Sequence, residues 1–303
     1  MSDRRRWWLR LIGPAIAILL LTRIDLHAIP AALAKVRWGP LFGSLALVVP
    51  LFGVKAWRWR LLLSAYGRHL SLGEAFELYM ISAGAGALTP GAAGDFWKSF
   101  SPSVGERSVG LWTSFLDRLY DVAFLAIFGA AVAIGWIASR ERRIEALAAL
   151  VVACVAVWLS RRPVLRRLGR LVPAIPLDRR ASRRNELGAC AATLVALMIA
   201  IMRFWLLVRA LDLPLRWVQI LVAFTLTSGV TALPLSVAGV GTRDLLLLGY
   251  LQSCGVSAAE AIALSSLCLL LFLWNGVVAL FLWVAAPLTL RSTARQQAIR
   301  KTG

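Results

Sequence analysis

The chain has 303 residues, of which 59% are hydrophobic and 16% are charged, and its mean hydropathy is +0.74. This composition is too apolar for a soluble domain and excludes one. The net charge of +19 comes from short basic runs between apolar windows, a pattern typical of membrane loops rather than of nucleic-acid surfaces. We therefore expect an all-α polytopic membrane protein with no nucleic-acid partner.

The first apolar window, residues 7–23, predicts a spanning helix. The N-terminal region also resembles a secretory signal peptide, because a basic end and an apolar core precede Ala-Leu-Ala at 32–34. Arg23, Asp25 and Pro30 interrupt the stretch between that core and the candidate cleavage site. We therefore expect the segment to remain as an uncleaved first span.

Apolar windows along the rest of the chain predict six ordinary spans in total and two interrupted regions. The spans are expected at 7–23, 40–57, 110–138, 146–160, 187–210 and 260–286. The interrupted regions are 73–100, broken at "TPGAAG", and 217–250, broken at "LPLSVAGVGT". In the first region, half-helices at 74–88 and 90–101 would extend only about 22 and 18 Å, short of the ~30 Å hydrocarbon core. Each region is expected to form a re-entrant hairpin, with a pair of kinked full crossings as the alternative.

Basic residues predict how the chain is oriented. If each hairpin returns to the side from which it came, the N-terminal arginines, the basic loop at 161–186 and the basic tail at 287–303 share one side. The positive-inside rule makes that side the cytoplasm. Arginines on the other side fall within 139–145, where Glu141 and Glu145 offset most of them. We expect a multi-pass protein of the cytoplasmic (inner) membrane with both termini in the cytoplasm.

The order of these elements predicts one integral-membrane domain, 1–303, with an internal repeat. The halves 7–138 and 146–286 each read span, span, broken hairpin, span, and the number of crossings gives them opposite orientations. The sequence "ALTPGAAGD" (87–95) recurs weakly as "ALPLSVAGVGTRD" (232–244). An inverted repeat with matching broken helices is typical of secondary transporters, which bind their cargo between the breaks.

Both hairpin breaks contain residues suited to helix N-termini. Thr89 is expected to be an N-cap with Pro90 at the first helical position, and Thr242 to begin the partner half-helix before Arg243 and Asp244. Helix N-termini carry unpaired N–H groups and a partial positive charge, and neighbouring glycines let a ligand approach the backbone. Two such tips in mid-membrane predict an anion site.

The stretch "FLDRLYD" places charged residues early in the span 110–138. Asp117 and Asp121 lie one turn apart on one helix face, and Arg118 stands three residues before Asp121. Charges inside a bilayer are costly and normally pair or face water, so this group predicts a polar cavity, which Asp95, Lys98 and Arg203 could join. An interfacial ion cluster that fixes the depth of the span is the alternative, and the pairing of acids and bases stays open.

These considerations define the candidate site residues. For substrate binding they are Thr89, Pro90, Gly91, Gly94, Asp95, Lys98, Asp117, Arg118, Asp121, Pro234, Ser236, Gly239, Gly241, Arg243 and Asp244. The four cysteines, Cys154, Cys190, Cys254 and Cys268, lack CxxC spacing, so we expect neither a disulfide nor a metal site. No catalytic residue and no cofactor are expected.

Four motifs resemble one known family in order and spacing. The segments "AWRWRLLL" (56–63), "TPGAAGDFWKS" (89–99), "SFLDRLYD" (114–121) and "PLSVAGVGTRD" (234–244) look like successive motifs of the lysylphosphatidylglycerol synthase transmembrane, or flippase-like, family. The resemblance implies a protein that moves or binds membrane lipids. Three positions depart from the usual motifs while keeping the sign of the charge: Lys98 replaces an arginine, Asp117 a glutamate and Asp244 a glutamate.

The first functional hypothesis is a lipid flippase or transporter for an anionic or phosphate-containing lipid, whose head group contacts Lys98, Arg118 and Arg243. A membrane-embedded lipid transferase, with an aspartate as general base, and a small-anion permease are the alternatives. Because the sequence stops soon after the last span, with no soluble acyltransferase domain, we expect no aminoacylation and no enzyme activity from this chain. Membrane lipids are the expected partners, and the oligomeric state stays open.

Overall fold

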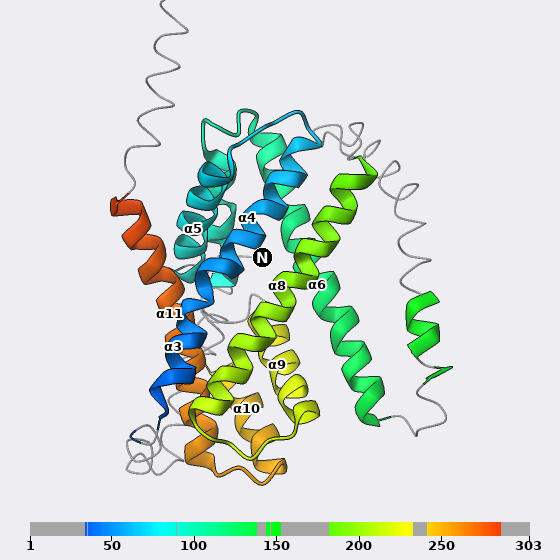
Figure 1. Cartoon of the computed structure of the whole chain (residues 1–303), viewed down its shortest axis with the longest axis vertical. Coiled ribbons are helices and arrows are strands. Elements are labelled where there is room, and N and C mark those ends of the chain that lie inside the picture. Colours follow the sequence, from blue (N-terminus) through cyan, green and yellow to red (C-terminus); the bar gives the residue numbers. More distant parts are fainter. Residues whose placement is uncertain are drawn as a thin grey trace, which may run out of the picture.

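The computed structural model describes residues 34, 36–88, 90–137, 144–145, 147–152, 182–232 and 241–285. Within these ranges the chain forms helices joined by turns, without a strand (Figure 1). The elements are α3 (Trp38–Ala46), α4 (Val48–Ser64), α5 (Leu72–Leu88), the 3₁₀ helix η1 (Pro90–Phe100), α6 (Arg107–Ile137), α8 (Arg183–Ala210), α9 (Trp217–Ala232), α10 (Thr242–Ser253) and α11 (Ala258–Ala285).

Four helical stretches are long and apolar enough to cross a membrane, so the chain is a multi-pass membrane protein. They are Trp38–Ser64, Arg107–Gly135, Arg183–Ala210 and Ala258–Ala279. These match four of the six expected spans. The span expected at 7–23 lies outside the described residues, as does most of the one expected at 146–160.

The first of these stretches consists of α3 and α4, with a break at Leu47. Pro50, in the first turn of α4, has no N–H to donate to the carbonyl of Ala46, and its ring crowds that carbonyl. The proline therefore interrupts the helix without ending the crossing. The span also reaches Ser64 rather than residue 57, which places Arg58 inside it.

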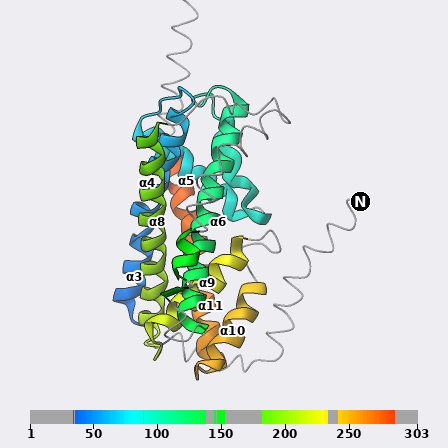
Figure 2. The same cartoon turned by 90° about the vertical axis from the view of Figure 1, so that its right-hand side faces the viewer.

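The spans on either side of the first helix pair, α4 and α6, run in directions opposite to those on either side of the second, α8 and α11. In Figure 1, α4 rises and α6 descends, whereas α8 descends and α11 rises. The hairpin of α5 and η1 hangs from the upper end, and α9 and α10 lie against each other at the lower end. The span that follows each of these helix pairs packs against the other pair, because α6 contacts α9 and α11 contacts α5. Figure 2 shows α4 and α8 side by side at one edge of the bundle.

The interrupted region 73–100 contains two short helices, as the sequence predicts, but the second one differs in type. The break falls where expected, because η1 begins at Pro90. The segment is a 3₁₀ helix and not the α-helical half-helix expected at 90–101. A 3₁₀ helix is narrower than an α-helix, and here it lies close to α5: a side chain at Gly94 would collide with the backbone of Ala85 and Gly86.

Local side-chain hydrogen bonds explain where several helices begin. Ser71 and Glu74 form a reciprocal capping box at the start of α5, and Ser257 and Glu260 form the same motif at α11. At α10 the cap is Gly241, whose φ of 84° suits glycine, and Thr242 is the first helical residue. The prediction that this half-helix begins at Thr242 is therefore confirmed.

Two hydrophobic clusters hold the described helices together. One joins α4, α5 and the loop before α6 around side chains such as Trp59, Leu63 and Met80. The other joins α8 to α11 around side chains such as Leu207 and Leu264. The polar residues described below lie between these two clusters.

Candidate functional site

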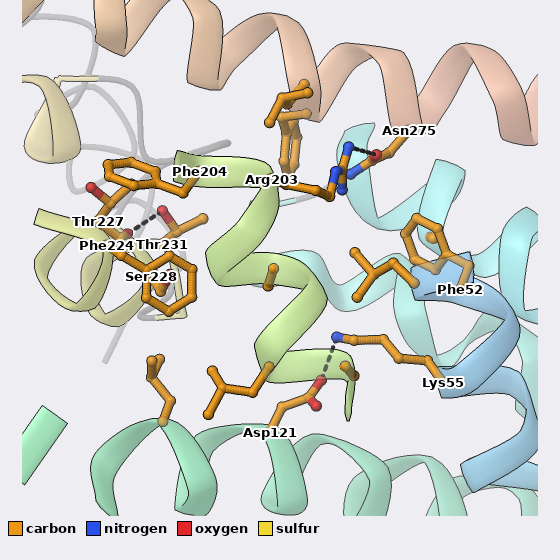
Figure 3. A pocket seen from close by; sticks show the side chains of 18 of the residues that line it. Phe52, Lys55, Asp121, Arg203, Phe204, Phe224, Thr227, Ser228, Thr231 and Asn275 are labelled. Atoms are coloured by element: carbon orange, nitrogen blue, oxygen red, sulfur yellow. Dashed lines mark hydrogen bonds and ion pairs between the residues drawn. The ribbon is translucent and has the colours of Figure 1, made fainter. Parts of the chain in front are cut away.

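A cavity of about 400 Å³ lies in the centre of the described bundle. Its walls come from α4, α5, η1 and α6 on one side and from α8, α9, α10 and α11 on the other. Figure 3 shows aromatic rings and hydroxyl groups around it. The labelled members of these two classes are Phe52, Phe204, Phe224, Thr227, Ser228 and Thr231. The wall is thus largely apolar, with charged groups at a few positions.

Arg58 of α4 is the centre of a buried ion network behind this wall. Its side chain is 0% exposed and donates to the carboxylates of Asp117 at 2.7 Å and Asp121 at 2.6 Å. It also donates to the hydroxyl of Thr193 on α8 and to the main-chain carbonyl of Asp117. Such complete pairing is what makes a buried guanidinium tolerable. Arg58 therefore ties α4 to α6 and α8.

Lys98 of η1 joins the same network from the hairpin. Its ammonium lies 2.9 Å from Asp117 and is 3.7 Å from the ring centroid of Tyr79, a cation–π contact. Tyr79 also donates its hydroxyl to Asp117 at 2.6 Å. Because Lys98 is 2% exposed and does not line the cavity, it fixes η1 to α6 and does not contact the space where cargo would bind.

Two ion pairs of this region do face the cavity. Lys55 of α4 contacts Asp121 at 2.7 Å (Figure 3), and Arg118 of α6 contacts Asp95 of η1 at 2.5 Å. All four residues line the cavity, and their side chains are between 23 and 34% exposed. The expectation that Asp117 and Asp121 share a helix face is confirmed, because both contact Arg58.

Arg203 of α8 lies on the other side of the cavity and has neutral partners. Its guanidinium donates to the main-chain carbonyl of Ser44 at 3.0 Å and to the side-chain oxygen of Asn275 at 3.2 Å (Figure 3). No carboxylate among the described residues comes within ion-pair distance of it, although the residue is only 6% exposed. The sequence analysis allowed Arg203 to join the charged cluster, but the structure places it apart from the Arg58 network. Among the described residues, its charge at the cavity wall has no carboxylate partner.

Arg243 lines the cavity from the N-terminal end of α10. It donates to Asp244 at 2.9 Å and to the carbonyl of Ser265 on α11 at 3.1 Å. Asp244 in turn accepts the N–H of Gly241 at 2.9 Å and contacts the hydroxyl of Ser265. This small network holds the start of α10 against α11.

The charged groups of the cavity and of the layer behind it do not balance. The basic members are Lys55, Arg58, Lys98, Arg118, Arg203 and Arg243, and the acidic members are Asp95, Asp117, Asp121 and Asp244. Six bases against four acids leave an excess of two positive charges among the described residues. The sequence of the two breaks, 89–93 and 233–240, contains no charged residue. The site is therefore electrostatically suited to an anion.

The structure brings part of the expected site together. Of the candidate residues, those that line the cavity are Asp95, Arg118, Asp121 and Arg243. Lys98, Asp117, Gly241 and Asp244 are placed behind it, and Gly94 packs against α5 rather than facing a ligand. Pro90 and Gly91 belong to η1, where only their backbone is described. Thr89, Pro234, Ser236 and Gly239 lie outside the described residues.

Sequence reasoning missed Lys55, Arg58 and Asn275. Arg58 falls just past the end of the span expected at 40–57, so its charge was not placed inside the membrane. The available signal was its spacing from Lys55: residues three or four apart share a helix face, and Lys55 and Arg58 are three apart. For Asn275 the signal was an amide within an otherwise apolar span.

Cys190, Cys254 and Cys268 form no disulfide bond within the described residues, and Cys268 lines the cavity. Within the described residues no group of three or more His, Cys, Asp or Glu side chains is arranged to hold a metal ion.

The fold and the site define a multi-pass helical membrane protein with charged side chains around a cavity inside the bundle. The match to a family model is more specific. Residues 9–280 match the model of the lysylphosphatidylglycerol synthase transmembrane region, and the chain belongs to that family. This membership associates the chain with membrane lipids. Neither a curated protein nor a solved structure matches it significantly.

Proposed function

We propose that this protein carries an anionic lipid across the membrane, with the head group in the central cavity and the acyl chains in the bilayer. The observation that supports this best is Arg203. A buried cation without a carboxylate partner is costly, and an anionic cargo would compensate it. The apolar walls beside it suit the glycerol and upper acyl region of a lipid.

An inverted repeat would explain how one cavity serves both membrane faces. The described elements follow the order span, helix pair, span twice, in opposite directions, and the packing of α6 on α9 repeats as that of α11 on α5. The spans before each helix pair also share a pattern: "RWRLLL" from Arg58 corresponds to "RFWLLV" from Arg203. In this proposal the two arginines are equivalent positions of the repeat, and alternating access arises from movement of one half against the other.

In the proposed orientation the upper end of Figure 1 faces the cytoplasm. The membrane is the cytoplasmic (inner) membrane. The described turns and helix ends there carry Arg60, Arg68, Arg107, Arg183 and Arg184, whereas those at the lower end carry Arg37, Arg209 and Arg216. This bias follows the positive-inside rule. Both termini would then be cytoplasmic.

The ion pairing of the carboxylates in the cavity favours a carrier over a transferase. Both carboxylates that line the cavity, Asp95 and Asp121, are held by basic side chains. While these pairs hold, neither carboxylate is available as a general base to take a proton from a substrate. We therefore propose transport without chemical change of the lipid.

The test is a flipping assay in sealed vesicles that contain the full-length protein. Vesicles carry a trace of fluorescent phosphatidylglycerol, which is anionic, or fluorescent phosphatidylcholine, which is zwitterionic, and an impermeant quencher reports the outer leaflet. We expect the protein to move the anionic probe faster. Arg203→Gln should slow this movement at least about tenfold, because a charged hydrogen bond contributes ~1.5–3 kcal/mol.

Arg209→Gln is the matched control, since Arg209 is an exposed arginine one and a half turns further along α8. It should behave as wild type. Equal movement of both probes, or no effect of Arg203→Gln, would contradict the proposal. Release of entrapped inorganic phosphate without movement of either lipid would favour the small-anion permease.

A further inference from the structure

The ion pair between Asp95 and Arg118 differs from the other pairs of the network. It joins the hairpin to a span, because Asp95 lies on η1 and Arg118 on α6. The side chains are 27% and 34% exposed, and both line the cavity. A head group in the cavity can therefore reach Arg118 without unfolding any helix.

The three acids of this region differ in how many partners hold them. Asp117 is bound by Arg58, Lys98 and Tyr79, and Asp121 by Lys55 and Arg58. Either acid keeps a base if one partner turns away. For Asp95, Arg118 is the one base within ion-pair distance among the described residues. An anion that takes Arg118 therefore leaves Asp95 without a close counter-charge.

The surroundings of Asp95 decide what happens to it then. The charged and titratable groups that face it are Arg118 and Asp117 from α6, Lys55 from α4, Tyr79 from α5 and Lys98 from its own helix. Lys55 and Lys98 are held by Asp121 and Asp117, and Asp117 repels a charge on Asp95. Gly86 of α5 lies directly against the Asp95 carboxylate. A carboxylate there, without its arginine, is favoured as the neutral acid.

We propose that Asp95 is a proton-binding site that exchanges its ion pair with Arg118 for a proton when an anionic head group binds Arg118. The exchange balances: the arginine–aspartate pair, one anion and one proton give an arginine–anion pair and a neutral aspartic acid. One proton thus accompanies each monoanionic lipid, and transport is electroneutral. Release of the head group lets Asp95 return its proton and bind Arg118 again. This coupling rests on the transport function proposed above.

The test uses the distribution of lipid at equilibrium rather than its rate. Full-length protein is reconstituted in vesicles with a trace of fluorescent phosphatidylglycerol and a pH difference of about one unit across the membrane. Because one proton moves with each anion, wild type should accumulate the probe about tenfold in the leaflet on the alkaline side. Asp95→Asn should move the probe to an equal distribution.

Glu106→Gln is the matched control, because Glu106 is an exposed acid in the loop between η1 and α6. It should retain the tenfold accumulation. An equal distribution in wild type overturns the coupling while leaving transport intact. Tenfold accumulation by Asp95→Asn overturns the assignment to Asp95. No movement by wild type overturns the transport function and the coupling with it.

A second measurement covers the case in which Asp95→Asn does not transport. Dioctanoyl phosphatidylglycerol is added to detergent-solubilised protein in weakly buffered solution at several pH values, and a pH dye reports proton uptake. Wild type and Glu106→Gln should take up about one proton per bound lipid at their maximum, and Asp95→Asn should bind the lipid with no uptake. Equal uptake by wild type and Asp95→Asn would overturn the proposal.

Discussion

Arg58 of α4 and Arg203 of α8 are two arginines inside spans, and they have opposite environments. Arg58 contacts two carboxylates and is fully enclosed, whereas Arg203 faces the cavity with neutral partners from Ser44 and Asn275. The acids that satisfy Arg58 come from α6, but α11 supplies an amide to Arg203. An arginine whose charge is matched thus serves as a structural tie, whereas one without a carboxylate partner among the described residues is, in the proposed function, a binding group.

Removing each charge in turn is the most direct test of whether Arg58 and Arg203 differ in their contribution to stability. Arg58→Leu should destabilise the protein by about 3–5 kcal/mol, because it leaves Asp117 and Asp121 short of a base in a buried position. Arg203→Leu should leave the stability unchanged or higher, because it removes an uncompensated charge. Thermal unfolding in detergent, followed by size-exclusion chromatography, measures both. Equal losses would show that the two arginines have the same structural role.

Two glycines, one in α6 and one in α10, offer a second contrast. A methyl group at Gly110 of α6 would meet the carbonyl oxygen of Ser99 at 2.6 Å, whereas one at Gly249 of α10 meets nothing within 4 Å. Gly110→Ala should therefore cost about 1–3 kcal/mol by forcing η1 away from α6. Gly249→Ala should be neutral or stabilise by up to ~1 kcal/mol through helix propensity. The same unfolding assay applies, and a reversed order would contradict the close packing of η1.

A further test gives Arg203 a carboxylate partner, which it does not have among the described residues. Asn275→Asp places a carboxylate where the amide oxygen now accepts from the guanidinium. We expect a gain of about 1–2 kcal/mol in stability together with loss of anionic-lipid movement, because the site would become paired like that of Arg58. Asn275→Ala is the control for loss of the amide, and it should lower stability. Full transport by Asn275→Asp would rule out Arg203 as the anion-binding group.

The exposed ion pair of Arg37 and Asp212 is expected to contribute least to the free energy of unfolding. Their side chains are 57% and 67% exposed and approach to 3.4 Å. Arg37→Ala should change the free energy of unfolding by less than about 1 kcal/mol, since water screens such pairs. A loss comparable to that of Arg58→Leu would mean that burial is not what separates strong pairs from weak ones here.

Much of the architecture could be predicted from the sequence, because long apolar windows and helix breakers act locally. The windows located four spans, and Pro90 located the start of η1. The type of η1 could not be predicted, since it depends on contact with α5 at Gly94. The start of α10 at Thr242 was predicted, but its cap was not, because the positive φ of Gly241 leaves no trace in hydropathy.

The candidate site was predicted in composition but not in arrangement. The acids at 117 and 121 and the base at 118 were found from their position inside a span. Their partners were not, because ion pairs between helices join residues such as Arg58 and Asp117, which are 59 positions apart. Lys98 was expected to contact a head group, but its short distance to Asp117 and Tyr79 turns it into part of the framework.

The length of α6 links this framework to the thickness of the membrane. The helix has 31 residues, about 46 Å, and none of its most apolar stretch is buried in the protein. A hydrocarbon core of ~30 Å is thinner than that, so α6 must tilt by an amount that depends on the bilayer. Because Arg118 and Asp121 lie on this helix and line the cavity, tilting moves both of these charges. We expect the rate of lipid movement to vary with acyl-chain length in reconstituted vesicles, and a constant rate would show that α6 keeps its angle. If the rate varies with chain length, the bilayer is both the source of the cargo and a regulator of its carrier.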